Sequence, residues 1–210
     1  MTILITGANR GVGAALAAGY CARGEKVIAT ARRPEGAEWL LDVTRPENFD
    51  ELSRRLDHTD LSLLVCNAGI YNDKGKTLPE LDADLWAEAM ATNVTGVFLT
   101  IRACLPALQR GKGKIAIISS VMASDERAPG GALVYRASKA AVLNLGRNLA
   151  QDLELPVGVY HPGWVRTDMG GAGAAVETET AAAGLMAQFD ALGPETTGSF
   201  LSYDGSPIPF

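Results

Sequence analysis

The sequence is poor in the residues that hold metals and disulfides. It has two histidines and three cysteines among 210 residues, and Cys21, Cys66 and Cys104 are odd in number and widely spaced. This pattern is typical of reduced, buried thiols, and without a Cys-x-x-Cys pair it offers no recognisable zinc motif. We therefore expect no disulfide framework and no bound metal.

The chain also lacks an excess of positive charge and a long apolar run. Its formal net charge is -5, so no general basic field attracts nucleic acid or an anionic membrane. No basic, apolar export signal precedes Gly7, and no window approaches the ~20 uninterrupted apolar residues of a membrane-spanning helix. We expect a cytoplasmic protein that acts on a small molecule, with no nucleic-acid or membrane partner.

What the chain does have is an alternation of strand-like and helix-like segments. Short apolar, β-branched runs are separated by longer stretches of helical composition, which predicts a parallel sheet with helices on both faces. The loops that leave the carboxyl ends of such strands meet at one edge, where ligands bind. With no repeat or linker, residues 1–210 are predicted to form one domain. The predicted strands are 2–6, 26–30, 61–66, 114–119, 157–160 and 199–203, and the predicted helices are 12–23, 46–57, 82–109, 134–154 and 178–192.

A glycine-rich turn directly follows the first predicted strand and opens a helix of small residues. Glycines permit a tight turn and close approach of a pyrophosphate, while the helix N-terminus supplies unpaired N–H groups and partial positive charge. A plain strand-to-helix turn would have a similar composition, but the position after the first strand favours a dinucleotide site. The residues of this expected site are Gly7, Asn9, Arg10, Gly11, Val12 and Gly13.

The end of the second predicted strand carries arginine where an NAD-binding protein usually presents an acidic residue to the ribose 2′-hydroxyl. Arg32 at this position, and Arg10 in the glycine turn, could pair with a 2′-phosphate through planar, charge-assisted hydrogen bonds. Both could instead be solvated surface arginines. We expect NADP(H) to be preferred over NAD(H).

Tyr135 and Lys139 stand four residues apart at the start of a predicted helix, which places the phenol and the ammonium on one face. An adjacent ammonium stabilises phenolate and draws the pKa of the tyrosine toward neutral pH. Such a pair is common by chance, but Ser120 follows the preceding strand and Asn93 interrupts another predicted helix. Ser120 could merely cap a strand end, and Asn93 could merely bond backbone in a helix kink.

In their order along the chain, these motifs resemble those of the short-chain dehydrogenase/reductase family over almost the whole length. The resemblance implies a doubly wound, Rossmann-type sheet of about seven strands in the order 3-2-1-4-5-6-7, and a catalytic tetrad in an NADP(H)-dependent oxidoreductase acting on a carbonyl or alcohol. The motifs that carry it are Thr6-Gly7-x-x-x-Gly11-x-Gly13, Asp42-Val43, Asn67-Ala68-Gly69, Asn93, Ser120, Tyr135-x-x-x-Lys139 and Pro162-Gly163-Trp164-Val165-Arg166-Thr167.

Each member of the tetrad has an expected task. Tyr135 exchanges a proton with the substrate oxygen, and Ser120 donates a hydrogen bond to that oxygen as negative charge develops on it. Lys139 supports the phenol and has donors for the nicotinamide ribose. Asn93 connects Lys139 to solvent through a bound water.

The resemblance also implies contacts along the cofactor. Asp42 and Val43 bracket the adenine, while Val165 and Thr167 fix the nicotinamide carboxamide. The other expected cofactor residues are Asn67, Ala68, Gly69, Pro162 and Gly163.

The substrate side is less defined because the expected substrate loop, about 169–185, is short. Residues just past strand ends are the candidates for a pocket that suits a medium-sized, rather apolar ketone or aldehyde. Trp164 and Met169 could equally be ordinary packing under the loop. The candidates are Val121, Met122, Tyr71, Trp164 and Met169.

Two alternatives to an oxidoreductase remain open. One is a signalling or regulatory protein that binds NADP(H) with little turnover, and the other is an epimerase or dehydratase, whose usual separate substrate domain 210 residues cannot supply. Self-association into a homodimer or homotetramer is expected, with the helices 82–109 and 134–154 pairing across two-fold axes.

Overall fold

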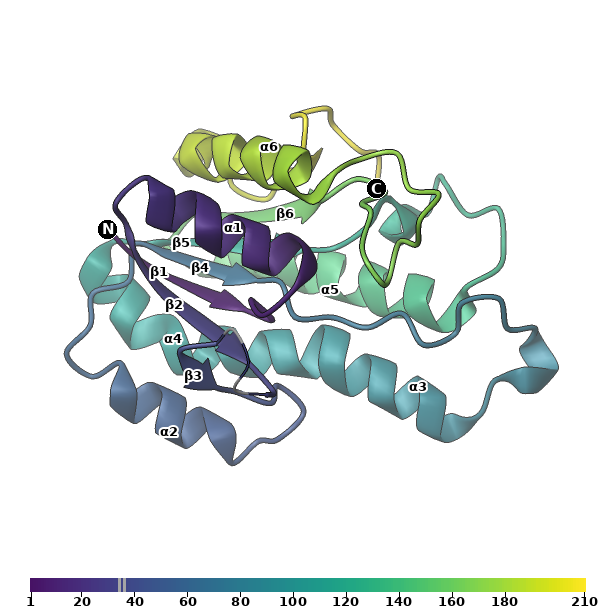
Figure 1. Cartoon of the computed structure of the whole chain (residues 1–210), viewed down its shortest axis with the longest axis horizontal. Helices are drawn as coiled ribbons and strands as arrows, with labels where there is room; N and C mark the ends of the chain where they lie inside the picture. The colour runs from purple at the N-terminus through teal and green to yellow at the C-terminus, as the bar shows by residue number, and fades with distance from the viewer. Residues whose placement is uncertain (34, 36) are drawn as a thin grey trace.

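The computed structural model describes residues 1–33, 35 and 37–210. In this described part, seven strands form one parallel sheet in the order β3-β2-β1-β4-β5-β6-β7, which confirms the doubly wound arrangement (Figure 1). The strands are β1 (Thr2–Thr6), β2 (Lys26–Ala31), β3 (Trp39–Leu40), β4 (Leu63–Cys66), β5 (Lys114–Ile118), β6 (Val157–His161) and β7 (Phe200–Ser202).

Helices cover both faces of the sheet (Figure 1). On one face, α1 and α6 lie side by side, and on the other face lie α2, α4 and α5, with α3 leading into α4. This is the arrangement that right-handed crossovers produce. The helices are α1 (Gly11–Ala22), α2 (Asn48–Arg55), α3 (Ala83–Met90), α4 (Gly96–Gly111), α5 (Leu133–Asp152) and α6 (Thr178–Ala191).

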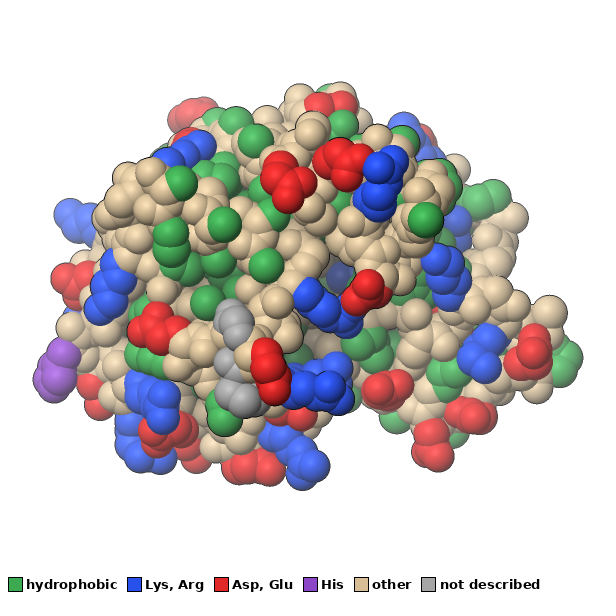
Figure 2. Space-filling view, viewed as in Figure 1, with side chains coloured by type: hydrophobic (Ala, Val, Ile, Leu, Met, Phe, Trp, Pro, Cys, Tyr) green, Lys and Arg blue, Asp and Glu red, His purple; other side chains and the backbone are tan. Residues whose placement is uncertain are grey.

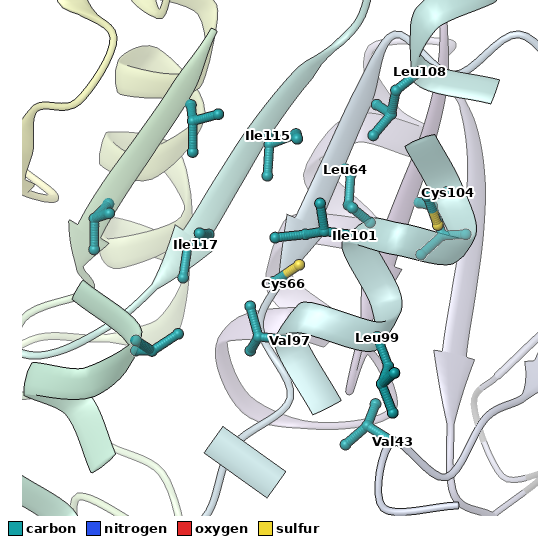
Figure 3. Packing of buried hydrophobic residues seen from close by; sticks show 14 of the residues in the cluster. Val43, Leu64, Cys66, Val97, Leu99, Ile101, Cys104, Leu108, Ile115 and Ile117 are labelled. Atoms are coloured by element: carbon teal, nitrogen blue, oxygen red, sulfur yellow. The ribbon is translucent and has the colours of Figure 1, made fainter. Parts of the chain in front are cut away.

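The alternation of side chains along each strand builds two apolar layers. In β4, Leu64 and Cys66 face the cluster under α2, α4 and α5, whereas Leu63 and Val65 face the cluster under α1 and α6. Figure 3 shows the first cluster, in which Val97, Ile101 and Leu108 of α4 pack toward the sheet. Because both faces of the central strands are buried, these strands read as continuous apolar runs.

Two elements differ from the sequence expectation. The strand β3 was missed because two residues are too few to show a period. The single helix predicted over 82–109 is instead α3 and α4, joined by the π-helical turn Ala91–Thr95. That turn is centred on Asn93, whose side chain bonds outside the helix.

The joined helical run Ala83–Gly111 is long and apolar enough to cross a membrane by length and composition alone. Half of its most apolar window is buried inside the protein, where α4 covers the sheet. Polar residues such as Arg102 interrupt the run, so it contains no uninterrupted apolar segment of membrane-spanning length. Its packing is that of a core helix.

Candidate active site

The loops at the carboxyl ends of β1, β2, β4, β5 and β6 line a cavity of about 980 Å³, near the upper end of the ~300–1,000 Å³ that ligand sites occupy. Figure 2 shows the surface hollowed near the centre of the view, with basic and acidic side chains meeting at the rim. Every expected catalytic, cofactor and substrate residue lines this cavity except Asp42 and Asn93. The fold therefore brings most of the expected site residues together around one cavity.

Several lining residues were missed by sequence reasoning. Most are immediate neighbours of motif residues on the same loops, so the topology could have found them. Lys74 is not next to a motif residue, so its sequence position does not predict its place in the cavity. It contacts Met169, which lies far away in the sequence. Those that bear on the argument are Arg33, Thr44, Ile70, Lys74, His161 and Gly170.

The glycine turn fits a dinucleotide pyrophosphate. Gly11 has φ of 55°, a left-handed conformation that favours glycine. A Cβ on Gly13 would lie 2.3 Å from the carbonyl oxygen of Gly7 and 2.5 Å from Nδ2 of Asn67, so only glycine fits there. The helix α1 begins at Gly11 with no side-chain cap, and this leaves its first N–H groups for an anionic ligand beside the cavity.

Two side chains join the glycine turn to the loop after β4. Thr6 Oγ1 accepts hydrogen bonds from the N–H groups of Asn67 and Ala68, both at 3.0 Å. Asn67 Nδ2 donates to the carbonyl oxygens of Thr6 at 2.9 Å and Gly7 at 3.0 Å. The expected cofactor residue Asn67 therefore holds the shape of the phosphate cradle.

The two expected phosphate arginines have different surroundings. Arg10 Nη1 donates to Asp168 Oδ2 at 2.6 Å, and both side chains are mostly exposed. Arg32 lines the cavity near Asp42. Both arginines therefore line the cavity, and an anionic ligand at Arg10 would have to compete with Asp168.

Asp42 does not line the cavity within the described residues. Its Oδ1 accepts from the N–H of Thr44 at 3.0 Å and from Thr44 Oγ1 at 2.7 Å, which closes a turn. Partial burial raises the pKa of Asp42, but these hydrogen bonds and the charges of Arg32 and Arg45 outweigh burial and lower it overall. The neighbours Val43 and Thr44 line the cavity in its place.

Tyr135 and Lys139 lie on the inner face of α5, and their side chains are buried. Lys139 Nζ is 5.7 Å from the centre of the Tyr135 ring and donates to the carbonyl oxygen of Ile118 at 3.0 Å. Ser120, just past β5, accepts a hydrogen bond from the N–H of Met122 at 3.1 Å, and its hydroxyl is near enough to the phenol of Tyr135 to lower the pKa of that group. The structure thus brings Ser120, Tyr135 and Lys139 together at the cavity wall.

Burial dominates the titration of this pair. It raises the pKa of Tyr135 to about 12 against the lowering effect of the hydrogen bond with Ser120, and it lowers the pKa of Lys139 to about 8. The expectation that Lys139 draws the pKa of Tyr135 toward neutrality is therefore wrong, because the buried ammonium is directed at Ile118 and desolvation is the larger effect. At neutral pH the phenol carries its proton.

Asn93 is fully buried behind the cavity wall. Its Oδ1 accepts from the N–H of Ile70 at 2.9 Å, and its Nδ2 donates to the carbonyl oxygen of Ile70 and to Ser138 Oγ, each at 2.9 Å. These bonds tie the loop after β4 to α5 and account for the π-helical turn. The structural role considered for Asn93 is thus present, and the proton relay stays a prediction.

Asp73 is a site residue that sequence reasoning missed. Its side chain is fully buried and accepts from the backbone N–H groups of Val134 at 2.8 Å and Tyr135 at 3.3 Å. The sequence did contain a signal, because the five residues directly before Leu133 (128–132) include no Ser, Thr, Asp or Asn to cap α5 locally.

The substrate side is built from the loop after β6 and the short helix η3 (Val121–Ala123). Trp164 is 59% exposed and its Nε1 donates to the carbonyl oxygen of Gly170 at 3.0 Å. Lys74 Nζ donates to the carbonyl oxygen of Met169 at 3.0 Å. Since α6 begins at Thr178, the irregular part of the expected 169–185 loop ends at Glu177.

The family model of short chain dehydrogenases matches residues 1–177. The chain belongs to the short-chain dehydrogenase/reductase family. This confirms the resemblance drawn from the motifs, and it makes the chain a member of a family of oxidoreductases.

Among curated relatives, this short-chain dehydrogenase/reductase is 33% identical over 184 residues to 3-oxoacyl-acyl-carrier-protein reductase FabG of Salmonella typhimurium, covering 79% of this chain and 74% of the relative. It is 33% identical to 1-hydroxy-2-glutathionyl-2-methyl-3-butene dehydrogenase of Rhodococcus, covering 98% and 97%. It is also 34% identical to C-signal of Myxococcus xanthus, covering 71% and 93%.

Solved structures of the family share the whole fold. The NADPH-bound carbonyl reductase from chicken fatty liver superposes with a TM-score of 0.90 at 28% identity, covering 100% of this chain and 98% of that one. The carbonyl reductase Sniffer of D. melanogaster gives a TM-score of 0.92 at 28% identity, covering 100% and 99%. The Rossmann-type architecture is therefore that of the family.

Proposed function

We propose that this chain is an NADP(H)-dependent oxidoreductase that transfers hydride between the nicotinamide and a carbonyl or secondary alcohol. The observation that carries the proposal is the phenol of Tyr135, which lies at the cavity wall with Ser120 and Lys139 beside it. A proton donor, a hydrogen-bond donor and a cation at one end of a dinucleotide-sized cavity are what carbonyl reduction requires.

The residues divide the chemistry between them. When bound, NADPH supplies the hydride. The Ser120 hydroxyl donates a hydrogen bond to the carbonyl oxygen and so stabilises the charge that develops there. Tyr135 then gives its proton to that oxygen, and the Lys139 ammonium stabilises the phenolate left behind. In the oxidation direction, the phenolate of Tyr135 takes the proton from the alcohol.

The same cavity has residues for each part of the cofactor. The N-terminus of α1 would hold the pyrophosphate, and Val43 would pack against the adenine. Arg10 and Arg32 would bind a 2′-phosphate, with Arg33 as a third cation on that rim. The preference for NADP(H) over NAD(H) rests on these arginines and on their place at the end of β2.

A second candidate is an NADP(H)-binding signalling protein with little turnover. The similarity to a relative named C-signal supports this second candidate. The arrangement of Ser120, Tyr135 and Lys139 in one cavity favours the enzyme, because a binding protein has no need of a buried proton donor.

The test is NADPH oxidation across ketones, aldehydes and quinones with the natural protein and with Tyr135→Phe. We expect Tyr135→Phe to lose roughly 100- to 10,000-fold in kcat, while the Kd for NADPH, measured by fluorescence titration, changes by less than about threefold because the ring remains. The matched control is Tyr20→Phe, a buried tyrosine of α1 in the core cluster under α6, which should retain turnover.

Two results would count against the proposal. Turnover that survives in Tyr135→Phe would remove the tyrosine from its assigned role. Tight NADPH binding by the natural protein with no turnover on any carbonyl would favour the signalling alternative.

A further inference from the structure

The catalytic helix α5 begins without a cap of its own. The residue before it, Ala132, has φ of 49°, and no side chain at that position bonds the first turn. The N–H groups of Val134 and Tyr135 are instead taken by the carboxylate of Asp73, which comes from the loop after β4, about sixty residues earlier. An acidic side chain at this end of a helix is favoured by the helix dipole.

Asp73 is buried without a cationic partner among the described residues that bond it. Tyr71, on the same loop, stacks on the ring of Tyr135 with ring centres 4.3 Å apart. A negative charge buried away from water, as that of Asp73 is, acts over a longer distance than one in water. The groups that face the phenol or its stacking partner are Tyr71 and Asp73 from the loop after β4, Ser120 before η3, and Arg136 and Lys139 from α5.

We propose that Asp73 is a positioning residue, which fixes the start of α5 and by its negative charge holds the proton on Tyr135. The inference rests on the proposed function, since it assigns Asp73 a task through the proton donor of that reaction. It accounts for a buried carboxylate where a neutral serine would be enough to cap a helix.

The titration of the phenols agrees with this role. Burial is the main reason that the pKa values of Tyr135 and Tyr71 are raised, and Asp73 adds to both increases. Lys139 stands four residues from Tyr135, but its Nζ is directed at the carbonyl oxygen of Ile118. Its ammonium therefore offsets the effect of Asp73 on the pKa of Tyr135 less than that spacing suggests. The nearest fixed negative charge to the start of α5 therefore favours a protonated phenol.

The experiment uses Asp73→Asn, which removes the negative charge and keeps a hydrogen-bond acceptor. The phenolate of Tyr135 is followed by near-ultraviolet difference absorbance against the same protein carrying Tyr135→Phe, and kcat for NADPH oxidation is measured across pH. We expect the phenolate midpoint and the alkaline loss of kcat to move to lower pH, on the order of half a pH unit. Asp73→Ser, a neutral residue that caps helices well, should give the same shift if Asp73→Asn does not fold.

The matched control is Asp82→Asn. Asp82 caps α3 by accepting from the N–H of Leu85 at 2.8 Å, and α3 carries none of the proposed catalytic residues. Like Asp73→Asn, this variant removes a charge at a helix start and keeps a hydrogen-bond acceptor, so it should leave the pH profile unmoved.

The inference would be overturned if both neutral variants of Asp73 titrate like the natural protein while Tyr135→Phe is inactive, because Asp73 would then be a helix cap only. Retained turnover in Tyr135→Phe would overturn the proposed function instead. The two failures are therefore distinguishable.

Discussion

At the scale of single residues, Lys139 is a cation buried where water cannot solvate it. Its side chain is 4% exposed, and its one hydrogen-bond acceptor among the described residues is the carbonyl oxygen of Ile118. Burial of a cation destabilises the folded protein, and buried cations of this kind are found mainly at functional sites. The cost should be measurable as a pH dependence of stability.

We predict that this cost declines as pH rises. Burial lowers the pKa of Lys139 from 10.5 in the unfolded chain to about 8 in the folded protein. Between these values the unfolded chain binds more protons, so the contribution of Lys139 to the free energy of unfolding rises with pH. In denaturant unfolding, the free energy of Lys139→Met minus that of the natural protein should therefore fall by roughly 2–3 kcal/mol across this window.

The control for this measurement is Lys76→Met at an exposed position, for which the difference should not change with pH. A difference for Lys139→Met that is constant over the same range would show that the ammonium is not desolvated in the folded protein.

At the scale of elements, the segment after β6 is held from both sides of the cavity. Arg10 of the glycine turn bonds Asp168, Lys74 of the loop after β4 bonds the carbonyl oxygen of Met169, and Arg166 pairs with Glu177 within the segment. This segment is therefore ordered by contacts with the elements that line the cavity.

The Arg10–Asp168 pair leads to a prediction about cofactor choice. If Arg10 binds the 2′-phosphate, Asp168 competes with that phosphate for the guanidinium. Because an exposed ion pair is worth about 0.2–1 kcal/mol, Asp168→Asn should tighten NADPH binding by roughly 1.4- to 5-fold and leave the Kd of NADH unchanged, as measured by fluorescence titration.

A matched surface pair provides the control. Arg23 and Asp190 form an exposed ion pair at 2.8 Å between α1 and α6, so Asp190→Asn should alter neither affinity. Equal changes for NADH and NADPH in Asp168→Asn would show that Arg10 does not distinguish the two cofactors.

What the sequence could predict also depends on scale. The strands and helices with long periodic patterns, and the motifs at their ends, were predictable because parallel topology brings the carboxyl-end loops together. The two residues of β3 were too few to predict. The π-helical turn at Asn93, the cap that Asp73 supplies and the raised pKa of Tyr135 each depend on burial or on partners distant in the sequence. Local sequence patterns contain no information on burial or on distant partners.

At the scale of the whole molecule, the face formed by α3 and α4 presents apolar side chains to solvent. Trp86 and Phe98 are 45% and 44% exposed, although Arg102 lies 5.9 Å from the ring of Phe98. Burying such side chains against a second copy would stabilise an assembly. The expected pairing involved the predicted helix 82–109, which the structure divides into α3 and α4, and the predicted helix 134–154.

We predict that light scattering finds a homodimer or homotetramer, and that Phe98→Asp shifts it toward monomer because a charge would be buried in the interface. Leu78→Asp, at another exposed apolar position outside these helices, should leave the mass unchanged. A monomeric natural protein, or an oligomer indifferent to Phe98→Asp, would contradict the expected interface.

The clamp between Thr6 and Asn67 and the pair between Arg10 and Asp168 join parts of the chain 61 and 158 positions apart. A chain still emerging from a ribosome has the glycine turn long before it has β6, the strand that positions Val165 and Thr167. Such a nascent chain has only one side of the proposed nicotinamide site. If NADP(H) binds as proposed, the nicotinamide could therefore be held only after the chain through Thr167 has been made and folded.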